Sequence, residues 1–177
     1  MAAIYEGTAP RKPRAFGEGA LPKDAFDSVP VPGSASFVMP SLAEPQIAAM
    51  PSNAPVRFAR MTSTFGMRAH PLLGGMRMHA GIDLAAPLAT PIRATADGVV
   101  SSAAWSGGYG LMVAIKHGGR LETRYGHMSR LAVRPGERVT KNSIIGYVGS
   151  TGRSTGPHLH YEVLRNGRPV NPLPYMR

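Results

Sequence analysis

The chain has 177 residues, of which 43% are hydrophobic and none is cysteine, and its formal net charge is +10 at pH 7. This length allows one domain and a tail, and the lack of cysteine excludes disulfides and thiolate metal sites. No apolar run reaches the 18 residues that a membrane-spanning helix needs, and the N-terminus lacks the basic and then apolar pattern of a secretory signal. We therefore expect neither a transmembrane segment nor an export signal in this chain.

Residues 1–55 differ in composition from the rest of the chain. Nine prolines interrupt every apolar run in this segment, and alanine, serine and glycine fill much of the remainder. Such a segment cannot bury enough apolar surface to offset the entropy that is lost on ordering. We interpret it as a Pro/Ala-rich tail or linker, followed by a folded domain at residues 56–177. The alternative is an inhibitory pro-segment, whose removal would raise the activity of the domain instead of leaving it unchanged.

The positive charge lies in residues 56–177. This part carries 16 Lys/Arg and five Asp/Glu, whereas residues 1–55 carry four Lys/Arg and five Asp/Glu. A surface as basic as this attracts polyanions. Because no recognition helix or aromatic-rich RNA-binding strand accompanies the charge, we do not expect a nucleic-acid partner.

From Thr62 onward, alternating or apolar runs follow one another, separated by turns rich in glycine, proline and asparagine. No stretch keeps a 3.6-residue period for longer than a couple of turns. The sequence therefore predicts a mainly β chain that forms a compact antiparallel β-sheet domain. The expected strands are residues 92–94, 98–105, 111–117, 121–125, 138–148 and 158–164.

The last of these strands brings three polar side chains to one face. Its apolar residues occupy alternate positions, so His158, His160 and Glu162 fall side by side on the opposite face. Two imidazoles that point into one space are typical of a metal site or of a base beside a metal. The pair alone is weak support, because exposed or core histidines can produce the same pattern.

Two other segments offer partners for these histidines. His79 and Asp83 are four residues apart, and Gly81 with the prolines that follow favours an extended segment and a loop instead of a helix. The strand expected at residues 121–125 leads into His127. Two histidines and one aspartate make a set of three ligands, the number that a catalytic zinc uses when one position stays open for water. Further histidines nearby can transfer protons.

Together these motifs closely resemble those of the lysostaphin-type, or LytM-domain, zinc metallopeptidases. The resemblance rests on His-x-x-x-Asp at 79–83, on Tyr-x-His at 125–127, and on Gly-Arg-Ser-Thr-Gly-Pro-His-Leu-His-Tyr-Glu at 152–162. It extends from about Met61 to Pro174. The second motif usually reads Tyr-Ala-His and here reads Tyr-Gly-His, which changes no functional side chain.

The resemblance implies a role for each motif residue. His79, Asp83 and His160 would be the ligands of a Zn²⁺ cofactor, while His127 and His158 would be catalytic histidines that do not bind the metal. The implied fold is the LytM-like, duplicated-hybrid-motif sheet that forms the floor of a groove. Glu162 is expected to support the ligands or to lie on the surface.

The implied function is hydrolysis of peptide cross-links in bacterial peptidoglycan by a zinc-dependent endopeptidase. The resemblance also implies a monomer that works in the cell envelope, with any export signal or anchor absent from this chain. Peptidoglycan carries peptide carboxylates, which suits the basic charge of the domain. The alternative is a non-catalytic LytM-type regulator that binds and activates another cell-wall hydrolase. Such regulators typically lose metal ligands, so the complete set here favours the enzyme.

Overall fold

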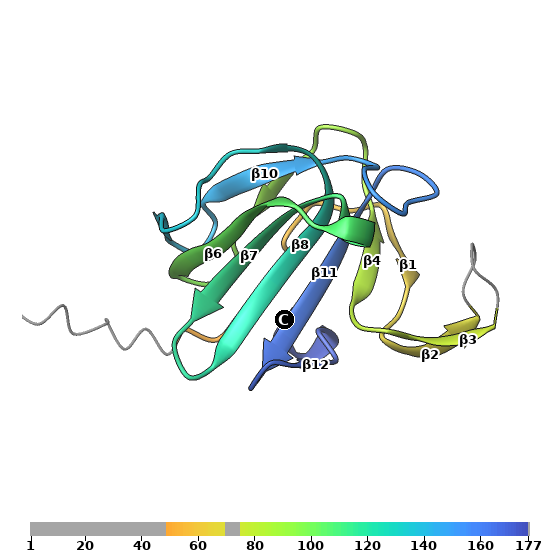
Figure 1. Ribbon diagram of the computed structural model, residues 1–177, viewed down its shortest axis with the longest axis horizontal. Coiled ribbons are helices and arrows are strands. Elements are labelled where there is room, and N and C mark those ends of the chain that lie inside the picture. Colours follow the sequence, from red (N-terminus) through yellow and green to blue (C-terminus); the bar gives the residue numbers. More distant parts are fainter. Residues whose placement is uncertain (1–48, 70–74, 177) are drawn as a thin grey trace, which may run out of the picture. The chain divides into compact units, whose positions relative to one another are not determined.

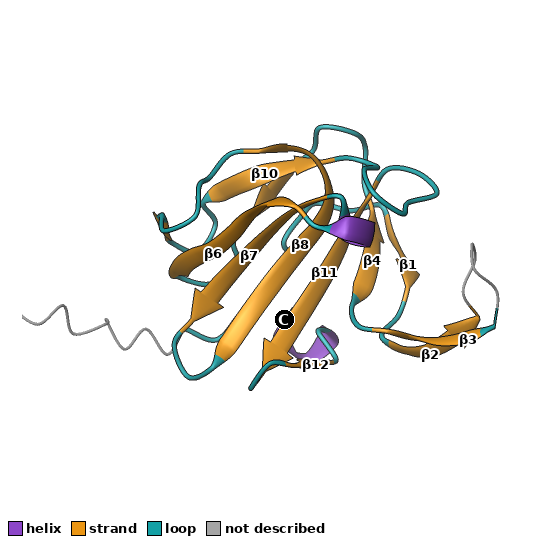
Figure 2. Ribbon diagram, viewed as in Figure 1, coloured by secondary structure: helices purple, strands orange, loops and turns teal. Residues whose placement is uncertain are grey.

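The structure is a computed structural model that describes residues 49–69 and 75–176 (Figure 1). Residues 1–48, which make up most of the expected tail, lie outside the described residues, as does His70. Strands dominate the described part, and the two helices in it are single turns of 3₁₀ helix (Figure 2). Among the described residues, no helix is both long enough and apolar enough to cross a membrane.

The main sheet is antiparallel, and its central strand order is β1-β4-β11-β8-β7-β6-β9. β5 and β10 pair with each other, β10 also pairs with β8, and β12 pairs with β11. A separate two-stranded sheet consists of β2 and β3. The strands are β1 (Arg60–Ser63), β2 (Gly66–Ala69), β3 (Met76–His79), β4 (Ile82–Ala85), β5 (Pro91–Arg93), β6 (Gly98–Trp105), β7 (Leu111–His117), β8 (Leu121–Leu131), β9 (Arg138–Val139), β10 (Ile144–Val148), β11 (His158–Arg165) and β12 (Arg168–Val170), and the 3₁₀ turns are η1 (Gly107–Tyr109) and η2 (Leu173–Tyr175).

The prediction of a mainly β, antiparallel domain is confirmed, but the strands differ in detail: β1 to β4 and β12 were not expected, β8 continues to Leu131, and one expected strand is divided. The run at residues 138–148 was predicted to be continuous, but it forms β9 and β10 with a turn between them. In that turn the Ser143 amide donates to the Thr140 carbonyl oxygen, 3.0 Å away, and Asn142 adopts a φ of 72°. Asparagine tolerates this left-handed conformation better than most residues, which explains where the chain reverses.

Alternation along β11 separates the core from the functional face, as predicted. Leu159, Tyr161 and Val163 are completely buried and belong to the main apolar cluster. That cluster also takes in Ile92 and Ile145, from β5 and β10. Each fully buried aliphatic side chain contributes about 1.5–3 kcal/mol, so the core holds β11 in one register and leaves its other face open for polar groups.

The chain that precedes β1 packs on the same domain. Pro51 and Val56 are buried, and the Arg93 amide donates to the Pro55 carbonyl oxygen at 2.7 Å. The Ser52 amide donates to the carbonyl oxygen of Thr95, 3.0 Å away. These contacts cover the region around β5 with a short extended segment.

A buried polar network lies within the core. His117 is 3% exposed, and its Nδ1–H donates to the Asp97 carbonyl oxygen at 2.7 Å. Its Nε2 lies 2.7 Å from the hydroxyl of Thr123, which in turn lies 3.0 Å from the hydroxyl of Tyr125. A neutral imidazole satisfies both neighbours, whereas a charged one would be buried without an ion-pair partner among the described residues.

We therefore predict that His117 makes folding pH-dependent. Burial lowers its pKa in the folded chain below the ordinary value. The unfolded chain binds the proton more readily, so the stabilisation is complete above about pH 6.5 and is lost as the pH falls below that value. With a chelator present, the unfolding free energy should fall more between pH 7 and pH 5 for the native chain than for His117→Gln, as measured by urea denaturation. Equal slopes in the two chains would contradict a neutral buried imidazole.

Candidate metal centre

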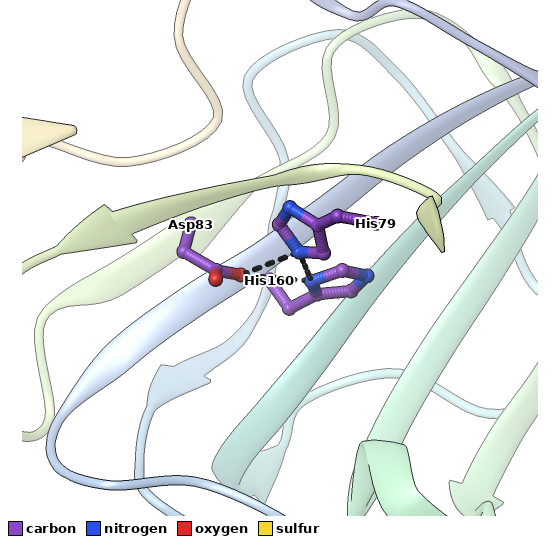
Figure 3. Close-up of side chains that lie close together, drawn as sticks. All are labelled: His79, Asp83 and His160. Atoms are coloured by element: carbon purple, nitrogen blue, oxygen red, sulfur yellow. Dashed lines mark hydrogen bonds and ion pairs between the residues drawn. The ribbon is translucent and has the colours of Figure 1, made fainter. Parts of the chain in front are cut away.

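Three side chains from different strands meet at one point (Figure 3). His79 ends β3, Asp83 lies in β4, and His160 lies in β11 directly opposite Asp83 in the antiparallel register. Asp83 Oδ1 is 2.8 Å from His160 Nδ1 and 3.3 Å from His79 Nε2, and the two nitrogens are 3.2 Å apart. Ligand atoms arranged tetrahedrally at zinc bond lengths lie about 3.3 Å apart. The donor types and their spacing therefore fit a zinc ion.

The second polar atom of each of these side chains is held by a neighbour. His79 Nδ1–H donates to the Thr64 carbonyl oxygen at 2.8 Å, which leaves Nε2 free to bind a metal. Asp83 Oδ2 accepts a hydrogen bond of 3.4 Å from the Arg68 guanidinium. Groups that fix the tautomer and orientation of ligands in this way are a regular part of protein metal sites. Neither the Thr64 carbonyl nor Arg68 was predicted, because a backbone oxygen and an isolated arginine give no motif.

Glu162 holds the third donor side chain, His160. Its Oε1 accepts from His160 Nε2–H at 2.9 Å and from the Tyr109 hydroxyl at 2.8 Å, and its side chain is 1% exposed. Arg124 approaches the other carboxylate oxygen at 3.7 Å. The sequence left two expectations for Glu162, a supporting role and a place on the surface. The supporting role agrees with its burial, and the place on the surface is wrong.

Hydrogen bonds decide the charge states at the centre. Burial by itself would raise the pKa of Asp83 and lower that of His160. The hydrogen bonds between them outweigh burial, so the pKa of Asp83 is well below its ordinary value and that of His160 is raised to about 9. Burial and the adjacent Glu162 carboxylate raise the pKa of Tyr109 to about 12, so its hydroxyl remains a donor. A metal would replace the proton that Asp83 and His160 share.

Two further imidazoles stand beside the three donors. The rings of His127 and His158 are 4.7 Å apart, and His158 Nε2 is 3.7 Å from Asp83 Oδ1. His127 Nδ1–H donates to the Thr151 carbonyl oxygen and His158 Nδ1–H to that of Gly156, each at 2.8 Å. In the neutral tautomers, Nε2 of both rings is therefore an acceptor. Burial lowers the pKa of His127 to about 4, and the neighbouring histidines act in the same direction.

A β-bulge directs His127 to this face. In the pairing of β7 with β8, Leu111 is opposite Met128 and Val113 is opposite Tyr125. Between these two pairs, β8 contains one residue more than β7. His127 adopts a φ of 59°, which is uncommon for a residue with a side chain. The extra residue lets His127 share the face of Glu162 while Tyr125 and Met128 both remain in the core. Strained backbone of this kind often accompanies functional side chains.

All five side chains line one hollow of about 660 Å³. Its walls also include the hairpin residues Arg68 and Met78, the loop residues Tyr109 and Arg153, and Arg60 from β1. The groove expected over the sheet is present. The structure thus brings together His79, Asp83, His127, His158 and His160, which are all the predicted site residues.

The family model of peptidase family M23 matches residues 77–172, which include these five residues. The chain belongs to peptidase family M23. The resemblance inferred from the three motifs is thereby confirmed. Similarity to solved members extends to the fold: a zinc-containing peptidase from Vibrio cholerae is 36% identical with a TM-score of 0.65, over 72% of this chain and 40% of that one.

Curated relatives of this M23 chain are similar over the same region. The DD-carboxypeptidase/endopeptidase Mpg of Neisseria meningitidis is 52% identical over 67% of this chain and 27% of its own length. The peptidoglycan DD-endopeptidase ShyC of Vibrio cholerae is 45% identical over 67% of this chain and 28% of its own length. The chain therefore spans little more than a quarter of the length of these relatives.

We predict that Glu162 tunes the affinity of the centre for metal. Removing its charge in Glu162→Gln weakens its hold on His160 Nε2–H, and changes of this kind typically lower metal affinity by about ten- to a hundredfold. Competition with a chromogenic chelator measures the effect for Zn²⁺. The matched control is Glu122→Gln, because Glu122 contacts Arg124 but no metal donor. Equal affinities in both variants would rule out the supporting role of Glu162.

Proposed function

We propose that this chain is a zinc-dependent endopeptidase that hydrolyses peptide cross-links of bacterial peptidoglycan. The observation that carries the proposal is the convergence of two imidazole nitrogens and a carboxylate oxygen at zinc-ligand spacing, beside two further imidazoles, those of His127 and His158. Membership of peptidase family M23 and the name of ShyC support the reaction and the substrate. A non-catalytic regulator has no need of this complete set of groups.

In this proposal, His79, Asp83 and His160 hold the zinc ion, and His127 and His158 are the catalytic histidines. Zinc at this position supplies a Lewis acid for the scissile carbonyl and lowers the pKa of a water molecule towards about 7. The fixed tautomers of His127 and His158 present two proton acceptors to the hollow. One imidazole takes the proton of the attacking water and returns it to the leaving amine. The other remains neutral, since two adjacent imidazolium ions repel each other.

The proposal extends to the domain and to its place of action. Residues 56–177 form the peptidase domain, and residues 1–55 serve as a linker whose last residues, 51–55, pack on that domain. The substrate places the reaction in the cell envelope. All five site residues come from one chain, so a monomer contains the complete centre. The relatives named above favour a DD cross-link over a glycine bridge.

We predict close to one zinc ion per purified chain. His79→Ala, Asp83→Ala and His160→Ala should each lose most of the zinc and all measurable cleavage, because two remaining ligands provide neither the affinity nor the geometry of three. Elemental analysis by mass spectrometry measures the metal. His117→Ala is the control, since His117 lies outside the hollow and should leave the zinc content unchanged. Full zinc occupancy in His160→Ala would show that the ligand assignment is wrong.

The catalytic histidines should behave differently. His127→Ala and His158→Ala should keep their zinc and their thermal unfolding temperature, yet lose about a hundredfold or more in kcat, the usual scale for general acid–base catalysis. Digestion of purified peptidoglycan, with the released muropeptides separated by chromatography, measures the rate. Native turnover in both variants would exclude these two residues from the reaction.

A further inference from the structure

A second hollow lies on the same face of the main sheet as the metal centre. It has a volume of about 850 Å³ and is formed by the start of β6, the end of β7, the start of β8 and the end of β11. Leu164, which lines it, follows His160 on β11 by four positions and so faces the same way. Strand geometry places the two residues about 13 Å apart. The two hollows thus occupy opposite halves of one sheet face.

The charged side chains of this second hollow are predominantly cationic. Four basic residues line it, together with one acidic residue, Glu122. Arg124 forms an ion pair with Glu122 at 2.7 Å and also approaches Glu162 beside the metal centre. Lys116, Arg120 and Arg138 are exposed and form no ion pair within residues 49–69 and 75–176. We call the hollow with these three cations the basic hollow.

Arg124 connects the two hollows. It lines the basic hollow, while its partner Glu162 lines the hollow around the metal centre, so the two hollows adjoin at this ion pair. About four residues of extended peptide span the roughly 13 Å of β11 from His160 to Leu164. Lys116 lies two strands to the side of Leu164, because both pair with Glu122, so a chain whose amide bond lies at the metal centre reaches this cation after about five extended residues.

We propose that the basic hollow binds a free carboxylate of the peptidoglycan peptide whose cross-link lies at the metal centre. This inference rests on the proposed function, and it adds a determinant of substrate choice. Peptidoglycan stem peptides carry free carboxylates within a few residues of their cross-links. A carboxylate complements Lys116, Arg120 and Arg138, which form no ion pair among the described residues, whereas an amidated stem peptide does not. Phosphate polymers would meet the same charges but have no peptide bond to align with the centre.

The test compares two variants of the full chain that lose the same charge. Lys116→Gln/Arg120→Gln/Arg138→Gln removes the three cations of the basic hollow. Arg57→Gln/Arg134→Gln/Lys141→Gln removes three cations that line neither hollow. Substrates are soluble cross-linked muropeptide dimers with free carboxylates and the same dimers with those carboxylates amidated. Zinc content and unfolding temperature establish that both variants are folded.

We expect the basic-hollow variant to raise KM for the free-carboxylate dimer about tenfold with kcat unchanged, the size that three partly exposed ion pairs can produce. For the amidated dimer, it should match the native chain. The control variant should stay within about twofold for both dimers. A native KM in the basic-hollow variant, or an equal change in both variants, would overturn the inference, because the effect would then be absent or due to net charge alone.

Two further measurements separate the alternative outcomes. If short inorganic polyphosphate inhibits the native chain but not the basic-hollow variant, while amidation leaves KM unchanged, then the hollow takes phosphate and the proposal is wrong. If the native chain cleaves no dimer, the proposed function fails. In that case, fluorescence anisotropy with labelled free and amidated dimers still tests the basic hollow, since tighter binding of the free form by the native chain alone supports it. Equal binding of both forms by the native chain and the variant overturns it.

Discussion

The pairing of β11 with β4 is the constraint on which the metal centre depends. His160 lies directly opposite Asp83, so the two donors are cross-strand neighbours on one face. The same register turns Leu159 and Tyr161 into the core, where both are completely buried. A shift of one residue would expose these apolar side chains and bury the ligands at once. The free energy of core packing therefore maintains the spacing of the donor atoms.

Charge compensation explains how the centre tolerates two buried carboxylates. Asp83 and Glu162 lie on either side of His160, and each has an arginine on its outer side, Arg68 and Arg124 respectively. Isolated buried carboxylates are costly, whereas paired and hydrogen-bonded ones are tolerated. A divalent metal ion would add positive charge next to Asp83, whose carboxylate already contacts the imidazoles of His79 and His160. The arginines thus stabilise the two ionised carboxylates, and the imidazoles need not be charged once a metal is bound.

The two hollows make the two ends of the sheet face chemically different. One end holds the metal donors and the imidazoles of His127 and His158, and the other end holds cations without ion-pair partners among the described residues. In the functions proposed above, reaction and recognition are separated along β8 and β11 and adjoin at Arg124 and Glu162. An extended ligand of only a few residues is long enough to occupy both halves at once.

Much of the site was determined by the sequence itself. The period of two along residues 158–164 placed His158, His160 and Glu162 on one face, and glycine and proline after His79 excluded a helix there. Local rules of this kind need no knowledge of distant residues.

Tertiary structure decided the rest. Alternation would have put His127 on the core face with Tyr125, and only the bulge that forms when β8 pairs with β7 brings it to the metal centre. Likewise, Glu162 became a buried support because Tyr109, from a distant turn, reaches its carboxylate. Such contacts depend on the exact pairing and packing of separate segments, which local sequence patterns do not encode.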